Sequence, residues 1–165
     1  MAIARVLKHL FATRTATRRR FSRDVIEAIE RAVAAIELRT SGEIRFAIDT
    51  ALELPEIWAD KSPRESALEA FARLRVWDSE LNNGVLIYVL MADRDVEIVA
   101  DRGAAARISP IEWEAACRLM ESHFREDRFR EGALAGVEAV GGLLVREFPC
   151  RAGNRDEIPN QPALL

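Results

Sequence analysis

Polar side chains recur where three predicted strands begin or end. The set consists of Ser41, Glu43, Asn82, Asn83, Asp101, Arg102 and Ser109. Carboxylate and amide oxygens gathered around one point bind a hard cation such as calcium or magnesium, and an arginine beside them can hold an anionic group. We take the set as a candidate cation or anion site, with Glu43, Asn83 and Asp101 as the metal ligands. The alternative is that these residues only form turns.

Whether these residues meet depends on the direction of the strands. Residues 43–50 alternate apolar and polar side chains, which predicts a half-buried strand. Residues 84–91 are nearly all apolar, which predicts a strand covered on both faces, and residues 96–100 return from it as a hairpin. A helix between the first two strands makes them parallel through a right-handed crossover. The candidate residues should then lie at one end of the sheet, which we call the rim.

Helix signals surround these strands. Ser62-Pro63-Arg64-Glu65 and Ser109-Pro110-Ile111-Glu112 each combine a capping box with a proline in the first turn. Apolar periodicity predicts further helices over residues 3–12, from Ser22 to Ser41-Gly42, and over 129–147. The predicted order is α-α-β-α-β-β-α-α. This order is typical of an α/β protein, a three-layer α/β/α sandwich with a small mixed sheet.

The chain divides into three predicted parts. Residues 1–21 form a basic amphipathic helix and a polar hinge, residues 22–149 form the α/β/α domain, and residues 150–165 form a flexible tail with two prolines. The two cysteines are too few for a disulfide framework or a zinc site. The longest apolar run spans residues 85–92, far short of the roughly 20 residues that a transmembrane helix needs.

The charge of the chain is strongly asymmetric. The net charge is −3, but residues 1–23 carry seven Lys or Arg and no acid, which leaves 17 basic and 27 acidic residues in the rest. Ile3, Val6, Leu7, Leu10 and Phe11 recur at helical spacing within this basic arm. A cationic arm on an acidic body argues against a nucleic-acid binder and permits contact with an anionic membrane surface or an acidic protein partner.

The candidate contact residues of the arm are its cations: Arg5, Lys8, Arg14, Arg18, Arg19 and Arg20. The alternative is that the apolar stripe of the arm packs on the body or on a second copy of the chain. No apolar stretch follows the first positive charges, so we predict no secretory signal. The expected location is cytoplasmic, at the periphery of the inner membrane face.

Four segments between Ser41 and Phe148 carry a family resemblance. They are Ser41-Gly42-Glu43-Ile44, Asn82-Asn83-Gly84-Val85-Leu86-Ile87, the Asp93-Arg94 turn with Val96-Glu97-Ile98, and the run from Arg128 to Gly136. In order and spacing they resemble the TPM domain family, named from a thylakoid lumen protein, a photosystem II repair factor and a nematode acetylcholine-receptor modulator. The resemblance implies an α/β/α fold, with divalent-cation sites in some members and acid-phosphatase activity proposed for some.

The chain departs from the family pattern after the third strand. Exported members carry Gly-x-Gly-Leu-Glu-Gly-x-Leu-Thr-Asp there, whereas residues 101–110 have alanine in place of the glutamate and proline in place of the aspartate. Two oxygen ligands are therefore missing, which weakens a metal site. We favour a non-catalytic binding or accessory module. The alternative is a divalent-metal-dependent phosphomonoester hydrolase, with Glu43, Asn82, Asn83 and Asp101 on calcium or magnesium and Arg102 on the phosphoryl group.

Overall fold

The computed structural model describes residues 2–150 and 157–165, and these ranges hold eight helices and four strands. The strands are β1 (Glu43–Asp49), β2 (Gly84–Leu90), β3 (Asp95–Ala100) and β4 (Ala163–Leu164). The helices are α1 (Ala2–Phe11), α2 (Arg14–Arg20), α3 (Arg23–Glu37), α4 (Leu54–Trp58), α5 (Pro63–Arg73), α6 (Arg102–Ala105), α7 (Pro110–Arg125) and α8 (Phe129–Glu147).

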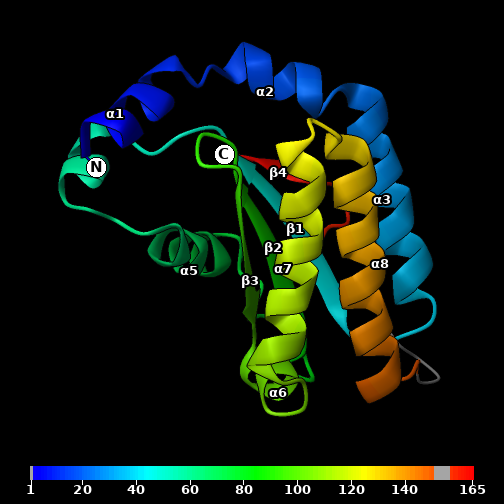
Figure 1. Cartoon of the computed structure of the whole chain (residues 1–165). Coiled ribbons are helices and arrows are strands. Elements are labelled where there is room, and N and C mark those ends of the chain that lie inside the picture. Colours follow the sequence, from blue (N-terminus) through cyan, green and yellow to red (C-terminus); the bar gives the residue numbers. More distant parts are fainter. Residues whose placement is uncertain (1, 151–156) are drawn as a thin grey trace.

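The sheet is mixed, with strand order β3-β2-β1-β4 (Figure 1). β1 and β2 are parallel with Glu43 opposite Gly84, and β3 returns antiparallel to β2 with Val85 opposite Ala100. The predicted direction of these three strands is confirmed. The starts of β1 and β2 and the end of β3 therefore share one end of the sheet, the rim.

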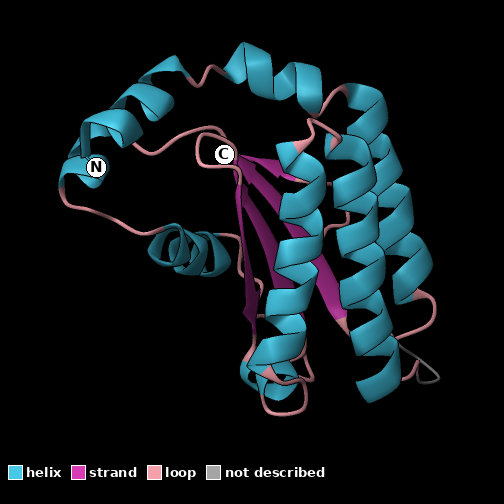
Figure 2. Cartoon of the chain, in the orientation of Figure 1, coloured by secondary structure: helices cyan, strands magenta, loops and turns pink. Residues whose placement is uncertain are grey.

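Helices cover the two faces of the sheet unequally. Figure 2 shows α3, α7 and α8 on one face and α5 on the other. The first face buries the larger core, in which Phe46 and Ile87 pack with residues of the three helices. The second face buries Leu86 and Tyr88 under a smaller cluster that includes Ala67 of α5. This mixed α/β architecture is the one that the element order predicts.

The N-terminal arm differs from its prediction, because residues 14–20 form helix α2 and not a polar hinge. Thr13 caps this helix by accepting a hydrogen bond from the Ala16 N–H at 3.2 Å. A side-chain cap of this kind offsets the lack of a continuous apolar stripe. In Figure 1, α1 and α2 follow each other along the end of the sheet opposite the rim.

The C-terminal residues also differ from their prediction. Residues 157–165 are not a loose tail: β4 pairs in parallel with β1, and the Leu165 N–H donates to the Ile48 carbonyl at 2.9 Å. Ile158 is buried against the smaller core. Ala163 and Leu165 pack against the same cluster, so backbone pairing and apolar contacts together order this segment. The remaining residues assigned to the tail, 151–156, lie outside the described residues.

Candidate functional site

The register of the sheet brings most of the predicted site residues together at the rim. The Glu43 N–H lies 3.5 Å from the Asn83 carbonyl, and the Asp101 N–H donates to the Gly84 carbonyl at 2.9 Å. Glu43, Gly84 and Asp101 thus stand in one row across the three strands. The row is what the predicted topology requires.

The innermost polar groups of the rim are engaged within the fold. Asn83 is buried, and its side-chain amide donates to the Ser41 carbonyl at 2.7 Å. Its own N–H donates to the Ser79 hydroxyl at 3.2 Å. The Glu43 carboxylate is buried as well and accepts a hydrogen bond from the Ile158 N–H at 3.3 Å. These contacts tie the starts of β1 and β2 to the loop before β2 and to the C-terminal segment.

The outer polar groups of the rim form a turn. Asn82 has a positive φ of 53° and accepts a hydrogen bond from the Arg102 guanidinium at 3.0 Å. Asp101 is the N-cap of α6 and accepts from the Arg102 N–H at 2.7 Å. Asn tolerates the left-handed conformation and Asp favours a helix cap. Turn and cap chemistry therefore account for these three residues.

Ser109 serves as the N-cap of α7. Its hydroxyl pairs with Glu112 in a capping box, and Glu112 also binds Arg146 of α8 at 2.8 Å. The Arg146 guanidinium and the Ser109 backbone together lower the pKa of Glu112 to about 2. The second sequence-predicted capping box, at Ser62 and Glu65, is present too. Ser109 thus has a structural role in joining α7 to α8.

The donor set of the rim does not fit a hard divalent cation. Such a cation takes about six to eight oxygen ligands. Two buried rim oxygens, Ser41 Oγ and Asp101 Oδ2, have no hydrogen-bond partner, whereas Asn83 and Glu43 are held as described above. Among residues 2–150 and 157–165, no group of three His, Cys, Asp or Glu side chains is placed to bind a metal ion. The metal-ligand hypothesis for Glu43, Asn83 and Asp101 has no support from this geometry.

The N-terminal helix docks on the domain through its polar side. Arg5 donates to the Lys61 carbonyl at 2.8 Å and contacts Asp93 at 3.3 Å. His9 is buried, accepts a hydrogen bond from the Leu52 N–H at 2.9 Å, and lies 3.1 Å from Asp93. The alternative that the apolar stripe packs back on the body does not hold for most of the stripe, because Val6 is the α1 residue that joins the smaller core.

The rest of the apolar stripe faces solvent. Ile3 is 78% exposed, Leu7 46%, Leu10 60% and Phe11 76%. α4 packs against α1 and adds two more exposed apolar side chains, Leu54 and Trp58. We call the surface formed by these six residues the α1 face. Exposed large apolar side chains grouped on two contacting helices are a feature of interaction surfaces.

The six cations of the arm fall into two groups. Arg5 and Arg20 are engaged, Arg5 with Asp93 and Arg20 with Asp127 at 3.1 Å and over the Phe129 ring. Lys8, Arg14, Arg18 and Arg19 are exposed and make no ion pair with any residue of the described ranges. Four of the candidate contact residues therefore keep their charge available to a partner.

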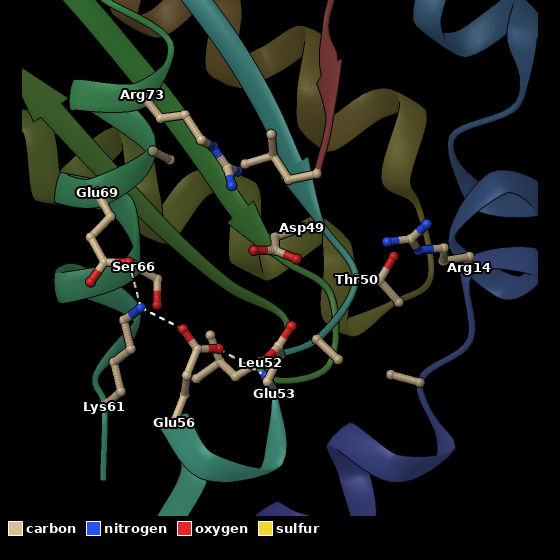
Figure 3. A pocket seen from close by; sticks show the side chains of 14 residues that line it. Arg14, Asp49, Thr50, Leu52, Glu53, Glu56, Lys61, Ser66, Glu69 and Arg73 are labelled. Atoms are coloured by element: carbon tan, nitrogen blue, oxygen red, sulfur yellow. Dashed lines mark hydrogen bonds and ion pairs between the residues drawn. The ribbon is translucent and has the colours of Figure 1, made fainter. Parts of the chain in front are cut away.

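A cavity lies at the end of the sheet opposite the rim, where β1 ends. It has a volume of about 640 Å³ and lies between the start of α2, the loop after β1, α4 and α5 (Figure 3). Asp49, Thr50, Lys61, Arg14 and Arg73 are among its lining residues. None of the predicted site residues lies at this end, although ligands of α/β sheets commonly bind at the carboxyl ends of parallel strands. The polar Asp49-Thr50 pair at the end of the first strand was the available signal.

Two arrangements fix the walls of the cavity. Lys61 bridges Glu56 of α4 and Glu69 of α5, each at 2.6 Å. On the sheet side, the Tyr88 hydroxyl donates to Asp49 at 2.9 Å. Burial, followed by the nearby Asp49 carboxylate, raises the pKa of Tyr88 well above its ordinary value. Tyr88 is therefore a neutral hydrogen-bond donor that orients Asp49.

Comparison with known families identifies the fold. The family model described as the TPM domain matches residues 16–143. The chain belongs to the TPM domain family. The sequence resemblance and the fold that it implies are thereby confirmed. The family match begins within α2, so the first helix of this TPM domain lies outside the matched residues.

Two solved structures resemble this TPM domain. The solution structure of the BA42 protein from the psychrophilic bacterium Bizionia argentinensis is 29% identical, with a TM-score of 0.76, covering 86% of this chain and 93% of that one. The N-terminal domain of a protein from P. gingivalis is 21% identical, with a TM-score of 0.57, covering 77% and 78%. Among curated proteins, none matches this TPM domain significantly. The described helices of the domain include none with the length and apolar content needed to span a bilayer.

Proposed function

We propose that this TPM domain is a non-catalytic accessory module that attaches to an anionic membrane surface through the α1 face. One observation carries the proposal: α1 binds its own domain with its polar side and turns its apolar side to solvent. Leu10 and Phe11 are 60% and 76% exposed, while His9 between α1 and the domain is 4% exposed. An amphipathic helix that only stabilised the domain would have the opposite orientation.

Charge and residue type favour a lipid surface as the occupant. Exposed Lys8 and Arg18 flank apolar side chains, which is the pattern of helices that lie in the interface of a bilayer. Trp58 beside α1 is 75% exposed, and tryptophan prefers the headgroup level of membranes. The cytoplasmic leaflet carries the negative surface potential that attracts such arms. The proposed location is therefore the periphery of the inner membrane face.

The rim does not contribute to this proposal. The Asn83 side-chain amide donates to the Ser41 carbonyl, and the Glu43 carboxylate accepts from the Ile158 N–H. A metal-dependent hydrolase needs open coordination positions around a bound cation, and these residues do not provide such a set. Turnover of a phosphomonoester that depends on calcium, magnesium or manganese would contradict the non-catalytic part of the proposal.

Vesicle flotation tests the membrane attachment. The native chain should float with phosphatidylcholine vesicles that contain phosphatidylglycerol, and much less with phosphatidylcholine alone. Leu10→Ser with Phe11→Ser should abolish flotation, because it removes apolar area without touching the Arg5 and His9 contacts. The matched control is Ile111→Ser on α7, which removes an apolar side chain that is 72% exposed and should leave flotation unchanged.

Two results would overturn the proposal. One is that the native chain remains with the lipid-free fraction on anionic vesicles. The other is that the native chain sediments as a dimer, does not float, and becomes a monomer in the Leu10→Ser, Phe11→Ser variant. In that second case the α1 face binds another copy of the chain and not a lipid surface.

A further inference from the structure

The cavity at the carboxyl end of β1 combines positive and negative side chains from separate elements. Arg14 comes from α2, Arg73 from α5, and Asp49 from the last position of β1. In Figure 3 the two guanidinium groups approach from opposite sides, with Asp49 and Thr50 between them. The volume of about 640 Å³ lies within the range of small-molecule sites, roughly 300–1,000 Å³.

The charges of the cavity divide into a satisfied group and an unsatisfied group. Lys61 is held by Glu56 and Glu69, and its side chain is only 14% exposed. Within residues 2–150 and 157–165, Arg14, Arg73, Asp49 and Glu53 make no ion pair, and the one side-chain hydrogen bond of Asp49 comes from neutral Tyr88. Two cations and two anions therefore line the same space without pairing with each other.

This arrangement selects against a ligand of a single charge sign. An anion that binds Arg14 or Arg73 also meets the Asp49 carboxylate, and a cation that binds Asp49 meets the guanidinium groups. Like charges at such close range repel each other, because the effective dielectric constant near a protein surface is well below that of water. A molecule with separate positive and negative ends can place its negative end at an arginine and its positive end at Asp49, so that both contacts are attractive.

We propose that this cavity binds a small zwitterion of the amino-acid class, a free amino acid or a short peptide. The carboxylate of the ligand lies against the Arg73 guanidinium, whose forked donors match a carboxylate in two parallel hydrogen bonds, and Arg14 adds positive charge on the other side of the cavity. The ammonium group donates to Asp49 and to the Thr50 hydroxyl. Tyr88 holds Asp49 in place for this contact. The site is separate from the α1 face, so it adds to the proposed membrane attachment and does not depend on it.

Amide chemical shifts of the full chain, titrated with three peptides, test the site. Triglycine carries both charges, N-acetyl-triglycine lacks the ammonium group, and triglycine amide lacks the carboxylate. We expect triglycine to shift the amide signals of residues 49–53 and 66–73, and each blocked peptide to bind at least about tenfold more weakly, a difference of roughly 1.4 kcal/mol. Equal binding of either blocked peptide, or no shifts with any of the three, overturns the proposal.

Variants connect the binding to the named side chains. Arg73→Gln and Asp49→Asn should each weaken triglycine binding about tenfold or more. The asparagine in Asp49→Asn keeps a side-chain oxygen that can accept the hydrogen bond from the Tyr88 hydroxyl. Arg102→Gln at the opposite end of the sheet is the matched control and should bind triglycine as the native chain does. Full binding by Arg73→Gln and Asp49→Asn together would also overturn the assignment. Failure of this proposal can be distinguished from failure of the membrane proposal, because Leu10 and Phe11, the residues changed in the flotation test, do not line the cavity.

Discussion

His9 and Asp93 are 84 positions apart in the sequence, and their side chains meet at 3.1 Å between α1 and the β2–β3 hairpin. The other ring nitrogen, Nδ1, accepts the Leu52 N–H, so Nε2 carries the proton that is donated to Asp93. One buried imidazole thus satisfies a backbone donor and a carboxylate at once. With the Arg5 contacts to Lys61 and Asp93, it holds α1 with its polar side inward.

Removal of the imidazole should therefore release α1. We expect His9→Ala to lower the free energy of unfolding by about 1–3 kcal/mol, because it leaves the buried Leu52 N–H without its acceptor and leaves Arg5 as the remaining partner of the Asp93 carboxylate. Trypsin should cut the arm after Arg14 faster, and the Leu52 amide should exchange faster with solvent. The control Lys8→Ala, on an exposed side chain of the same helix, should change neither rate. Unaltered Leu52 exchange in His9→Ala would show that other contacts hold the helix.

Asp95 gives the domain a pH-dependent stability. Burial, then the Glu97, Glu121 and Asp93 carboxylates, raise its pKa to about 6, and Arg5 opposes the shift. Its Oδ1 atom is buried without a hydrogen-bond partner. Because the folded chain binds this proton more tightly than the unfolded chain, stability should fall as pH rises from about 4 to about 6 and stay lower above that.

Asp95→Asn tests this dependence. A rise in pKa from 3.8 to about 6 corresponds to about 3 kcal/mol, but Asp95 is partly exposed and solvent screening reduces the effect to about 1 kcal/mol. The variant should therefore be more stable than the native chain by about that amount near pH 7, and equally stable below about pH 4, where both side chains are neutral. Urea unfolding at the two pH values measures the difference. A gain of the same size at both would point to packing and not to charge.

The parts of the fold that were predictable have local signals. The strands show period-two or continuous apolar patterns, and the capping boxes at Ser62 and Ser109 mark the starts of α5 and α7. β4 has no such signal, because two residues carry no periodicity and their pairing with β1 depends on tertiary contact alone. α2 was missed for a related reason: its sequence, RTATRRR, has no apolar stripe.

The site was less predictable than the fold. The topology correctly gathers Glu43, Asn83 and Asp101 at the rim, but sequence cannot show that these groups are used by Ser41, Ile158 and the α6 cap. Such hydrogen bonds depend on backbone positions that only the folded chain defines. The inverted orientation of α1 was hidden for the same reason, since its apolar periodicity is equal whichever side faces the domain.

Glycines at two positions should respond to alanine in opposite directions. A Cβ at Gly84 would lie 2.0 Å from the Val76 carbonyl oxygen, a backbone atom that cannot move aside. At Gly142 in α8 the same Cβ meets nothing within 4 Å. We expect Gly84→Ala to unfold the domain or to destabilise it by about 3 kcal/mol or more, and Gly142→Ala to stabilise it by about 0.5–1 kcal/mol.

Thermal and urea unfolding compare the two glycine variants with the native chain. Gly136→Ala should fall between them, because its Cβ would lie 2.1 Å from the sulfur of Met120, a flexible side chain that can change rotamer. The sequence alone does not distinguish these positions, since all three are glycines in or beside apolar segments. A stable Gly84→Ala variant would mean that the loop at Val76 can withdraw from β2.

Asn83 decides whether the rim is a structural junction or a metal site. As a junction, Asn83→Ala loses the amide hydrogen bond to the Ser41 carbonyl and should lower the free energy of unfolding by about 1–3 kcal/mol. Asn82→Gly is the matched control: glycine adopts the positive φ freely, so this neighbour should change stability much less. As a metal site, the rim would bind calcium in the folded state only, and millimolar calcium would raise the melting temperature of the native chain but not of Asn83→Ala. We expect calcium to leave both melting temperatures unchanged, because the side-chain oxygens of Asn83 and Glu43 already accept hydrogen bonds from Ser79 and Ile158.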